Sequence, residues 1–246
     1  MANVPVHPHE MRLLGAWTFR TAGSPVHVQV REQRLLALLG LRGPQSRASA
    51  AGALWPDSTE DRARANLRTS LVRIRQGLGD VVVARRDEVG LDDSVVVDVH
   101  ALRGTLDDAE ADPQEVATRG AHALRSLRMP ELLVGWYDDW VLFDRERLQH
   151  RTIRALEELA RVSLDGGRSD EAAIFAEEAV ALEPLLDSAV TLQVRALLRS
   201  GNLSAALQAY RTFRARLQAE LRVAPPEQLT ALMRSAMAER SLAARP

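Results

Sequence analysis

An internal repeat of 34 residues in the C-terminal part is the feature that most constrains the fold of this chain. Aligning Gly167 with Gly201 also aligns Ala172 with Ala206, and the segments around them have the same pattern. Such a period accommodates two helices and a turn, with glycine ending one helix and alanine permitting close contact between helices. The sequence therefore predicts a stack of helix pairs in this part of the chain.

The whole region from Gly104 onward is predicted to be helical, and its period is that of tetratricopeptide repeats. Proline and glycine residues separate six expected helices, at residues 113–127, 145–165, 169–182, 185–199, 203–221 and 226–240. We expect an aromatic cluster to pack the first of these helices onto the repeat: Trp136, Tyr137, Trp140 and Phe143.

The first hundred residues combine short strands with helices. Apolar and alternating patterns predict strands at residues 11–19 and 26–30. Helices are expected at 31–41, at 47–55 with Ser46 as its cap, and at 60–78 with Ser58 or Thr59 as its cap. Two β-branched runs follow, at 81–83 and 95–99, and their turn-rich connection predicts a hairpin between them.

Charge is distributed unevenly along the chain. All 32 basic residues are arginines, and the formal net charge is −1. From Arg12 to Arg86 there are 13 arginines and five acidic residues, a net charge of +8. From Gly104 to Pro246 there are 18 arginines and 22 acidic residues, a net charge of −4. A polyanion-binding N-terminal part and a C-terminal part of another kind are therefore expected.

Several classes of function are disfavoured. Cysteine is absent, so disulfides, thiol nucleophiles and cysteine-ligated zinc are excluded. The six histidines are scattered without metal-binding spacing, and no phosphate-binding loop or nucleophile elbow is present. Asp138 and Asp139 are adjacent on one segment and cannot flank a substrate, so we expect no enzymatic activity and no cofactor. Without a secretory signal or an apolar span, we expect a cytoplasmic protein that does not contact the membrane.

The helix predicted at 60–78 has two faces of different chemistry. At about 100° per residue, a buried stripe is formed by four apolar residues: Leu67, Leu71, Ile74 and Leu78. Nearly opposite the stripe lie five polar residues: Arg62, Asn66, Thr69, Arg73 and Gln76. Three further arginines flank the stripe, the last of them nearer its buried edge: Arg64, Arg68 and Arg75.

This polar face suits the major groove of DNA. Arginine pairs with guanine, asparagine pairs with adenine, and a threonine methyl group can touch thymine. The alternative is a solvated face whose arginines pair with acidic residues. Only Glu60 and Asp61 lie nearby in the sequence, and the preceding helix carries no acidic residue. This scarcity of acids favours DNA binding.

Two further sites are candidates for contact with DNA. Arg85 and Arg86 lie beside the predicted hairpin turn, where they can reach phosphate or the minor groove. Arg47 begins the second helix and can bind phosphate together with the free amides of that helix. In each case the alternative is an ordinary exposed arginine.

Specific motifs give the chain a recognisable resemblance. The core Leu67-Arg68, followed by Arg73-Ile74-Arg75, and the preceding SRASAAGALWPD segment resemble the OmpR/PhoB-type winged helix. The C-terminal segments VDVHAL, WYDDWVLFDRERL and ELRVAP resemble the bacterial transcriptional activator domain (BTAD). Together, over residues 10 to 240, the chain is similar to small members of the Streptomyces antibiotic regulatory protein (SARP) family.

The resemblance implies a mostly α protein, with an α+β winged helix-turn-helix at residues 10–96 and an all-α tetratricopeptide-like BTAD at 97–240. Residues 1–9 and 241–246 are expected to be flexible ends. The resemblance also implies that the recognition helix contacts DNA through Thr69, Arg73 and Arg75. The family wing often reads G-Y-x-L, whereas this chain has Asp87-Glu88-Val89-Gly90-Leu91.

The implied function is that of a pathway-specific activator of secondary metabolism, such as antibiotic biosynthesis. Such an activator binds direct repeats in double-stranded promoter DNA, with protomers paired head to tail, and recruits RNA polymerase including its sigma subunit. It would be associated with the nucleoid. The alternative is a tetratricopeptide-type adaptor whose winged helix no longer binds DNA.

Overall fold

The computed structural model describes residues 9–128 and 130–243, without the side chains of the last four of these residues. Most of the predicted flexible ends, residues 1–8 and 244–246, lie outside the described residues. The rest of the predicted ends is regular, because residue 9 lies in the first strand and residues 241–243 in the last helix. Within the described ranges, no helix is long and apolar enough to cross a membrane.

The chain divides into two compact units, each of which is described by itself. The first unit combines the described residues up to Arg103 with 130–146, and the second contains 104–128 and the residues from Arg147 onward. Helices α4 (Asp98–Ala111) and α7 (Asp139–Asp165) contribute residues to both units. The predicted boundary at 96/97 therefore differs from the packing boundary, because residues 97–103 and 130–146 pack with the N-terminal unit.

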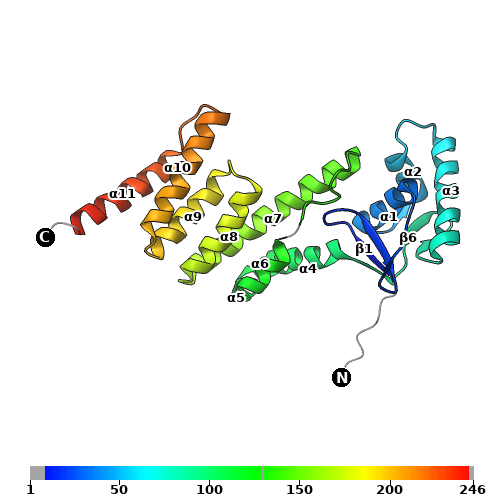
Figure 1. The fold of residues 1–246 in the computed structure, drawn as a ribbon, viewed down its shortest axis with the longest axis horizontal. Coiled ribbons are helices and arrows are strands. Elements are labelled where there is room, and N and C mark those ends of the chain that lie inside the picture. Colours follow the sequence, from blue (N-terminus) through cyan, green and yellow to red (C-terminus); the bar gives the residue numbers. More distant parts are fainter. Residues whose placement is uncertain (1–8, 129, 244–246) are drawn as a thin grey trace, which may run out of the picture. The chain divides into compact units, whose positions relative to one another are not determined.

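The first unit has the winged-helix architecture implied by the resemblance (Figure 1). Its strands are β1 (His9–Arg12), β2 (Thr18–Thr21), β3 (Ser24–Pro25), β4 (Gln45–Ser46), β5 (Val82–Ala84), β6 (Glu88–Leu91) and β7 (Val95–Val97). Its helices are α1 (Val30–Arg42), α2 (Arg47–Leu54) and α3 (Glu60–Leu78). One sheet has the order β3-β2-β1-β7, and a second has the order β4-β6-β5.

The predicted strand at 11–19 is wrong as a single element. It forms β1 and β2, which pair antiparallel with Met11 opposite Phe19. Gly15 lies in the connection with a φ of 88°, a conformation that glycine adopts without steric cost and that ends a strand. The predicted strand at 26–30 is also wrong, since only Val28 is buried there and Val30 already begins α1.

The predicted hairpin between residues 81–83 and 95–99 is wrong in its pairing. β5 pairs with β6, with Val83 opposite Gly90, and these two strands form the wing. β7 instead pairs parallel with β1, with Val97 opposite Met11. A valine run indicates a strand but does not specify its partner, because cross-strand packing selects the pairing.

The helices of the first unit agree closely with the sequence predictions. Ser46 caps α2 as predicted, because its Oγ accepts a hydrogen bond from the backbone N–H of Ser49 at 3.0 Å. α1 is the centre of the core and buries Leu35 through Leu41. An added Cβ at Gly40 would lie 2.5 Å from the terminal methyl group of Met11, so the Met11 side chain would have to move.

A strap formed by residues 130–138 and the start of α7 completes the first unit. The backbone N–H of Leu133 donates to the carbonyl oxygen of Leu13 at 2.7 Å. Arg145 donates from Nε to the carbonyl oxygen of Leu132 at 2.9 Å and from its terminal nitrogen to that of Leu133 at 2.8 Å. Asp144 accepts a hydrogen bond from Nε of Arg42 in α1 at 2.8 Å. The bond to Leu13 fixes the strap next to the end of β1, the bond to Arg42 fixes it to α1, and the Arg145 bonds hold the strap together.

The aromatic cluster does not pack helices onto the repeat, contrary to the prediction. Trp136 and Trp140 meet edge to face with 6.5 Å between ring centroids, and they belong to the first unit. Tyr137 and Phe143 are 79% and 61% exposed. The aromatic residues indicated a packed cluster but not the unit against which it packs. In the structure Trp140 is buried within the first unit, whereas Tyr137 and Phe143 remain exposed.

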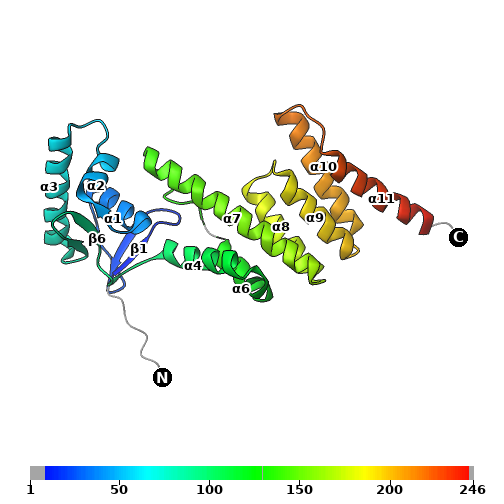
Figure 2. The ribbon, with the colours of Figure 1, turned by 180° about the vertical axis from the view of Figure 1, so that it is seen from behind.

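The second unit is all α, and the fold class predicted from the sequence is confirmed. Besides parts of α4 and α7, its helices are α5 (Pro113–Thr118), α6 (Ala121–Leu127), α8 (Ser169–Leu182), α9 (Asp187–Arg199), α10 (Leu203–Glu220) and α11 (Glu227–Ala243). The predicted helix at 113–127 is broken in two, because Gly120 adopts a φ of 49° between α5 and α6. α8, α9 and α10 lie side by side in both views (Figures 1 and 2).

The 34-residue repeat is visible in the backbone geometry. Gly167 and Gly201 have φ values of 76° and 78°. The residue after each glycine donates its N–H to the carbonyl oxygen five residues earlier, at 2.8 Å in both repeats. Ala172 and Ala206 are both fully buried. Glycine and alanine therefore have the same roles in both repeats, as their spacing predicted.

The first helices of the second unit are joined by a charged cluster. Arg151 of α7 donates from Nε to Glu110 at 3.0 Å and from a terminal nitrogen to Asp107 at 2.7 Å. These hydrogen bonds, to Glu110 first and then to Asp107, raise the pKa of the Arg151 guanidinium above its ordinary value. The cluster ties α4 to α7 within this unit.

Candidate nucleic-acid interface

The buried side of α3 is rotated relative to the helical-wheel prediction. The buried residues are Ala63, Leu67, Ser70 and Ile74, whereas Leu71 and Leu78 are only half-buried. At about 100° per residue, this shift turns the centre of the outward face toward Arg68 and Val72. Ala63 and Ser70 were not predicted to be buried, because the predicted stripe contained only large apolar side chains.

Most of the predicted DNA-contacting residues of α3 are exposed. Arg62, Arg68 and Thr69 are exposed, and Asn66 is half-buried at the edge of the face. Arg75, which the helical wheel placed nearer the buried side, has 78% of its side chain exposed and pairs with Asp80 at 3.2 Å. Arg75 therefore lies farther from the buried side than predicted, because the rotation of the buried arc turns this residue outward.

Arg73 has an acidic neighbour that the sequence did not reveal. A terminal nitrogen of Arg73 lies 3.8 Å from a carboxylate oxygen of Glu32 in α1. Glu32 is only 3% exposed, and neither of its carboxylate oxygens accepts a hydrogen bond. Glu32 is distant from α3 in the sequence and comes close to Arg73 only through the packing of α1. Nearer in sequence, Glu60 pairs with Arg64, one turn along α3.

The wing is held by the first residue of α2. Nε of Arg47 donates to the carbonyl oxygen of Arg85 at 3.1 Å, and the backbone N–H of Arg47 donates to that of Asp87 at 3.0 Å. Arg85 and Arg86 are exposed at the turn between β5 and β6. The amides of Arg47 and Ser49, two of those at the start of α2, are therefore engaged within the protein.

A groove between α3 and the wing collects three of the predicted arginines. It has a volume of about 510 Å³ and is lined by Arg47, Arg68 and Arg75. Its lining also includes Val82 of β5 and one acidic residue, Asp80. Three guanidinium groups around an open groove can bind the phosphates of a nucleic-acid backbone through charge-assisted hydrogen bonds. Arg62 and Asn66 do not line this groove.

Val72 belongs to the candidate interface and was not predicted from the sequence. Its side chain is apolar but 55% exposed, because it lies near the centre of the outward face of α3. The spacing of Val72, three residues after Thr69 and four after Arg68, places it on the same face as these two residues. It was not predicted because the buried side of the helix was centred on a different arc. Elsewhere among the described residues, no cluster of three histidine or acidic side chains could hold a metal ion.

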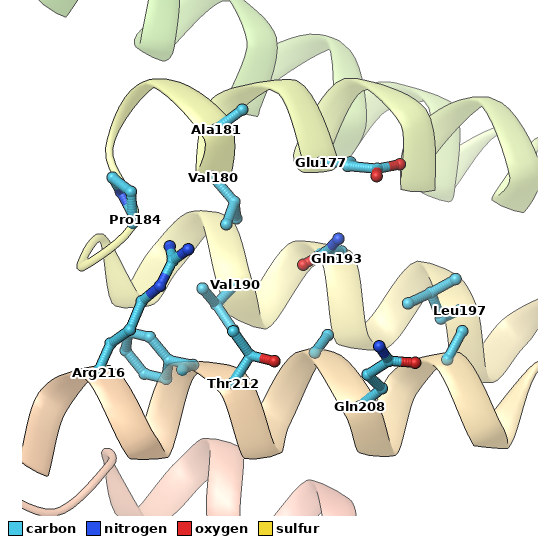
Figure 3. A pocket seen from close by; sticks show the side chains of 13 residues that line it. Glu177, Val180, Ala181, Pro184, Val190, Gln193, Leu197, Gln208, Thr212 and Arg216 are labelled. Atoms are coloured by element: carbon cyan, nitrogen blue, oxygen red, sulfur yellow. The ribbon is translucent and has the colours of Figure 1, made fainter.

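The second unit has a groove of its own, between α8, α9 and α10 (Figure 3). Its volume is about 460 Å³. Val180, Val190 and Leu197 give it an apolar floor, and Glu177 and Arg216 are its charged residues. In Figure 3, Arg216 of α10 extends toward Pro184 at one end of the groove. An apolar floor with separated charges of opposite sign suits a protein segment better than a polyanion.

Comparison with known proteins agrees with this arrangement of a winged helix followed by helical repeats. The profile of the bacterial transcriptional activator domain family matches residues 93–236, which is more than half of the chain. The chain therefore belongs to the bacterial transcriptional activator domain family. The resemblance to the SARP family is confirmed by this match together with the fold.

A solved structure shares the fold of both units. It is that of Mycobacterium tuberculosis EmbR in complex with a low-affinity phosphopeptide, and it matches with a TM-score of 0.69 and 22% sequence identity. The match covers 94% of this chain and 65% of the EmbR chain, so this chain spans less than two thirds of that structure. A search of curated protein sequences finds no significant match.

Proposed function

We propose that the first unit binds double-stranded DNA in a sequence-specific manner, with α3 in the major groove. The observation that carries this proposal is the array of exposed arginines along α3 beside the groove that Arg47 also lines. Arg62 and Arg68 are positioned to reach base edges or phosphates, because guanidinium groups recognise both. Asn66, Thr69, Arg73 and Arg75 complete the candidate contact set.

The wing supplies a second contact in this proposal. Arg85 and Arg86 lie at its tip, and the bond from Arg47 fixes the turn that carries them. A basic hairpin tip held in this way can contact the phosphate backbone or the minor groove. Asp87 and Glu88 reduce the local positive charge, so we expect the wing to contribute less than α3.

The second unit is proposed to bind a protein partner and to activate transcription. From Gly104 onward the net charge is −4, which disfavours contact with DNA phosphates. The groove between α8, α9 and α10 offers a surface for a protein segment. The family resemblance points to RNA polymerase, including its sigma subunit, as the partner, and to pathway-specific control of secondary metabolism.

The arrangement on DNA also follows from the resemblance. Direct repeats in a promoter call for two protomers placed head to tail, because a two-fold symmetric dimer would require inverted repeats. The protein would act in the cytoplasm, on the nucleoid. Footprinting on DNA upstream of neighbouring genes, followed by inversion of one repeat, tests this geometry.

Salt dependence of DNA binding tests the proposal as a whole. Each arginine that neutralises a phosphate contributes about 0.9 to the slope of log affinity against log salt concentration. Arg68→Ala is expected to lower the slope by about one, whereas Arg125→Ala in α6 should leave it unchanged. Equal affinity for the footprinted site and for scrambled DNA would contradict sequence-specific binding.

A protein-interaction adaptor is the second candidate function. It is favoured by the ion pairs that Arg73 and Arg75 form within the chain, since paired arginines are less available to DNA. In that case the protein would bind neither promoter nor random DNA at physiological salt. It would still bind a protein partner through the second unit.

A further inference from the structure

The outward face of α3 carries a ridge of small apolar groups. Ala65, Thr69 and Val72 are all exposed. They are four and three residues apart, so they follow one another along a single face of the helix. We call these three side chains the apolar ridge of α3. Arg62 and Arg68, both exposed, lie on either side of it.

The hydroxyl group of Thr69 is turned toward the helix backbone. Its Oγ1 donates a hydrogen bond to the carbonyl oxygen of Ala65 at 3.0 Å. This bond occupies the hydroxyl proton and leaves the methyl group of Thr69 for contacts outside the helix. The ridge therefore presents methyl groups at all three positions.

Val72 is unusual at its position. A single exposed apolar residue on a protein surface needs no explanation. Here, however, a β-branched residue lies in a helix, where it is weakly unfavourable, and it continues the line formed by Ala65 and Thr69. Long polar side chains surround this line on an arginine-rich face. An apolar ridge flanked by arginines matches a DNA edge where methyl groups lie between phosphates or guanines.

We propose that the apolar ridge of α3 recognises the 5-methyl groups of thymine in the major groove. The methyl group is the feature that distinguishes thymine from the other bases at that edge, and apolar side chains recognise it by contact. Thr69 and Val72 contact the methyl groups of neighbouring thymines, and Ala65 allows the helix to approach closely. This inference rests on the proposed function, because it names the bases that the same helix reads.

Single replacement of thymine by uracil tests the methyl contacts directly. Uracil retains the hydrogen-bonding edge of thymine and lacks only the methyl group. DNA selected from a random library by the full chain is resynthesised with uracil at one thymine at a time. Wild-type affinity is expected to fall about three- to fivefold at one or two positions, which corresponds to the burial of one methyl group each.

Matched variants assign each position to a side chain. Thr69→Ser keeps the hydroxyl and removes the methyl group, so it should bind thymine DNA about three- to fivefold more weakly and lose its sensitivity to uracil at one position. Thr69→Val keeps a methyl group and removes the hydroxyl, so it should retain that sensitivity. Val72→Ala should lose sensitivity at a neighbouring position. Val30→Ala, at an exposed valine of α1, is the control and should behave like the wild type.

The possible results separate this inference from the proposed function. If the wild type selects a defined sequence but uracil has no effect anywhere, DNA binding stands and the ridge does not read thymine. Persistence of uracil sensitivity in both Thr69→Ser and Val72→Ala also overturns the inference. If no sequence is selected at all, both the proposed function and the inference fail. Thermal melting followed by circular dichroism checks that each variant is folded.

Discussion

The Nε atom of Arg47 donates a hydrogen bond to the backbone carbonyl oxygen of Arg85, across 3.1 Å. This bond joins the first residue of α2 to the tip of the wing, 38 residues later in the chain. The side chain of Arg47 also lines the groove between α3 and the wing. One arginine thus fixes the wing and contributes positive charge where a phosphate would lie.

Replacing Arg47 therefore has two separable consequences. Arg47→Ala is expected to weaken DNA binding about 5- to 30-fold, because it removes a charge-assisted contact worth about 1–2 kcal/mol and releases the wing turn. Arg47→Lys restores the charge without the Nε bond and should recover only part of the affinity. Fluorescence anisotropy with labelled operator DNA measures the change. Equal affinities for wild type and Arg47→Ala would contradict a role for this residue at the interface.

The pairing of Arg73 with Glu32 predicts a coupling between stability and DNA recognition. Arg73→Ala leaves the buried carboxylate of Glu32 without its neighbouring positive charge. We expect a loss of about 1–2 kcal/mol in the free energy of unfolding, less than for a fully buried pair because Arg73 is half exposed. The double variant Glu32→Gln/Arg73→Ala should recover most of this stability. Urea unfolding at pH 7 compares both variants with the wild type.

The same two variants show whether Arg73 has only a structural role or also reads a base. If Arg73 also reads a base, the double variant recovers stability but stays about 1–3 kcal/mol weaker in binding its operator. Recovery of both properties together would assign Arg73 a structural role alone.

Asp98 is expected to be essential for the stability of the first unit. Its carboxylate accepts hydrogen bonds from the backbone N–H groups of Leu13 at 2.8 Å and Leu14 at 3.1 Å. Asp98→Ala leaves both donors without these partners in a part-buried environment, so the free energy of unfolding should fall by about 2–4 kcal/mol. Asp93→Ala, at an exposed position on the preceding turn, is the matched control. A similar effect of the two substitutions would contradict this role of Asp98.

Gly167 should be intolerant of a side chain for conformational reasons. Nothing lies near the position of an added Cβ atom, but the φ of 76° is unfavourable for any other residue. Gly167→Ala is expected to cost about 1–2 kcal/mol of stability. Gly52→Ala is the control: it also has open space around its Cβ position but lies within α2. There alanine should stabilise the helix by about 0.5–1 kcal/mol. Thermal unfolding of the two variants should therefore shift in opposite directions.

Local sequence was sufficient to predict most helices and their ends. Ser46 caps α2 through its own side chain, and Gly167 and Gly201 end their helices in the left-handed conformation. A cap or a helix-ending glycine acts on backbone groups a few residues away, so the local sequence determines where the helix begins or ends. The 34-residue repeat was predictable because both of its copies carry the same local signals, and the arginine-rich face of α3 was predictable from helical periodicity.

Tertiary packing decided the remaining features, because each depends on residues distant in sequence. The partner of β7 is β1, more than 80 residues earlier, and no local pattern in a valine run specifies that pairing. Likewise, the buried arc of α3 is set by what packs against it, which is why Ser70 is buried and Val72 is not. Glu32 reaches Arg73 only because α1 and α3 pack together. The sequence by itself determined most of the helices and their chemistry, and tertiary structure selected the strand pairing and the face that each helix buries.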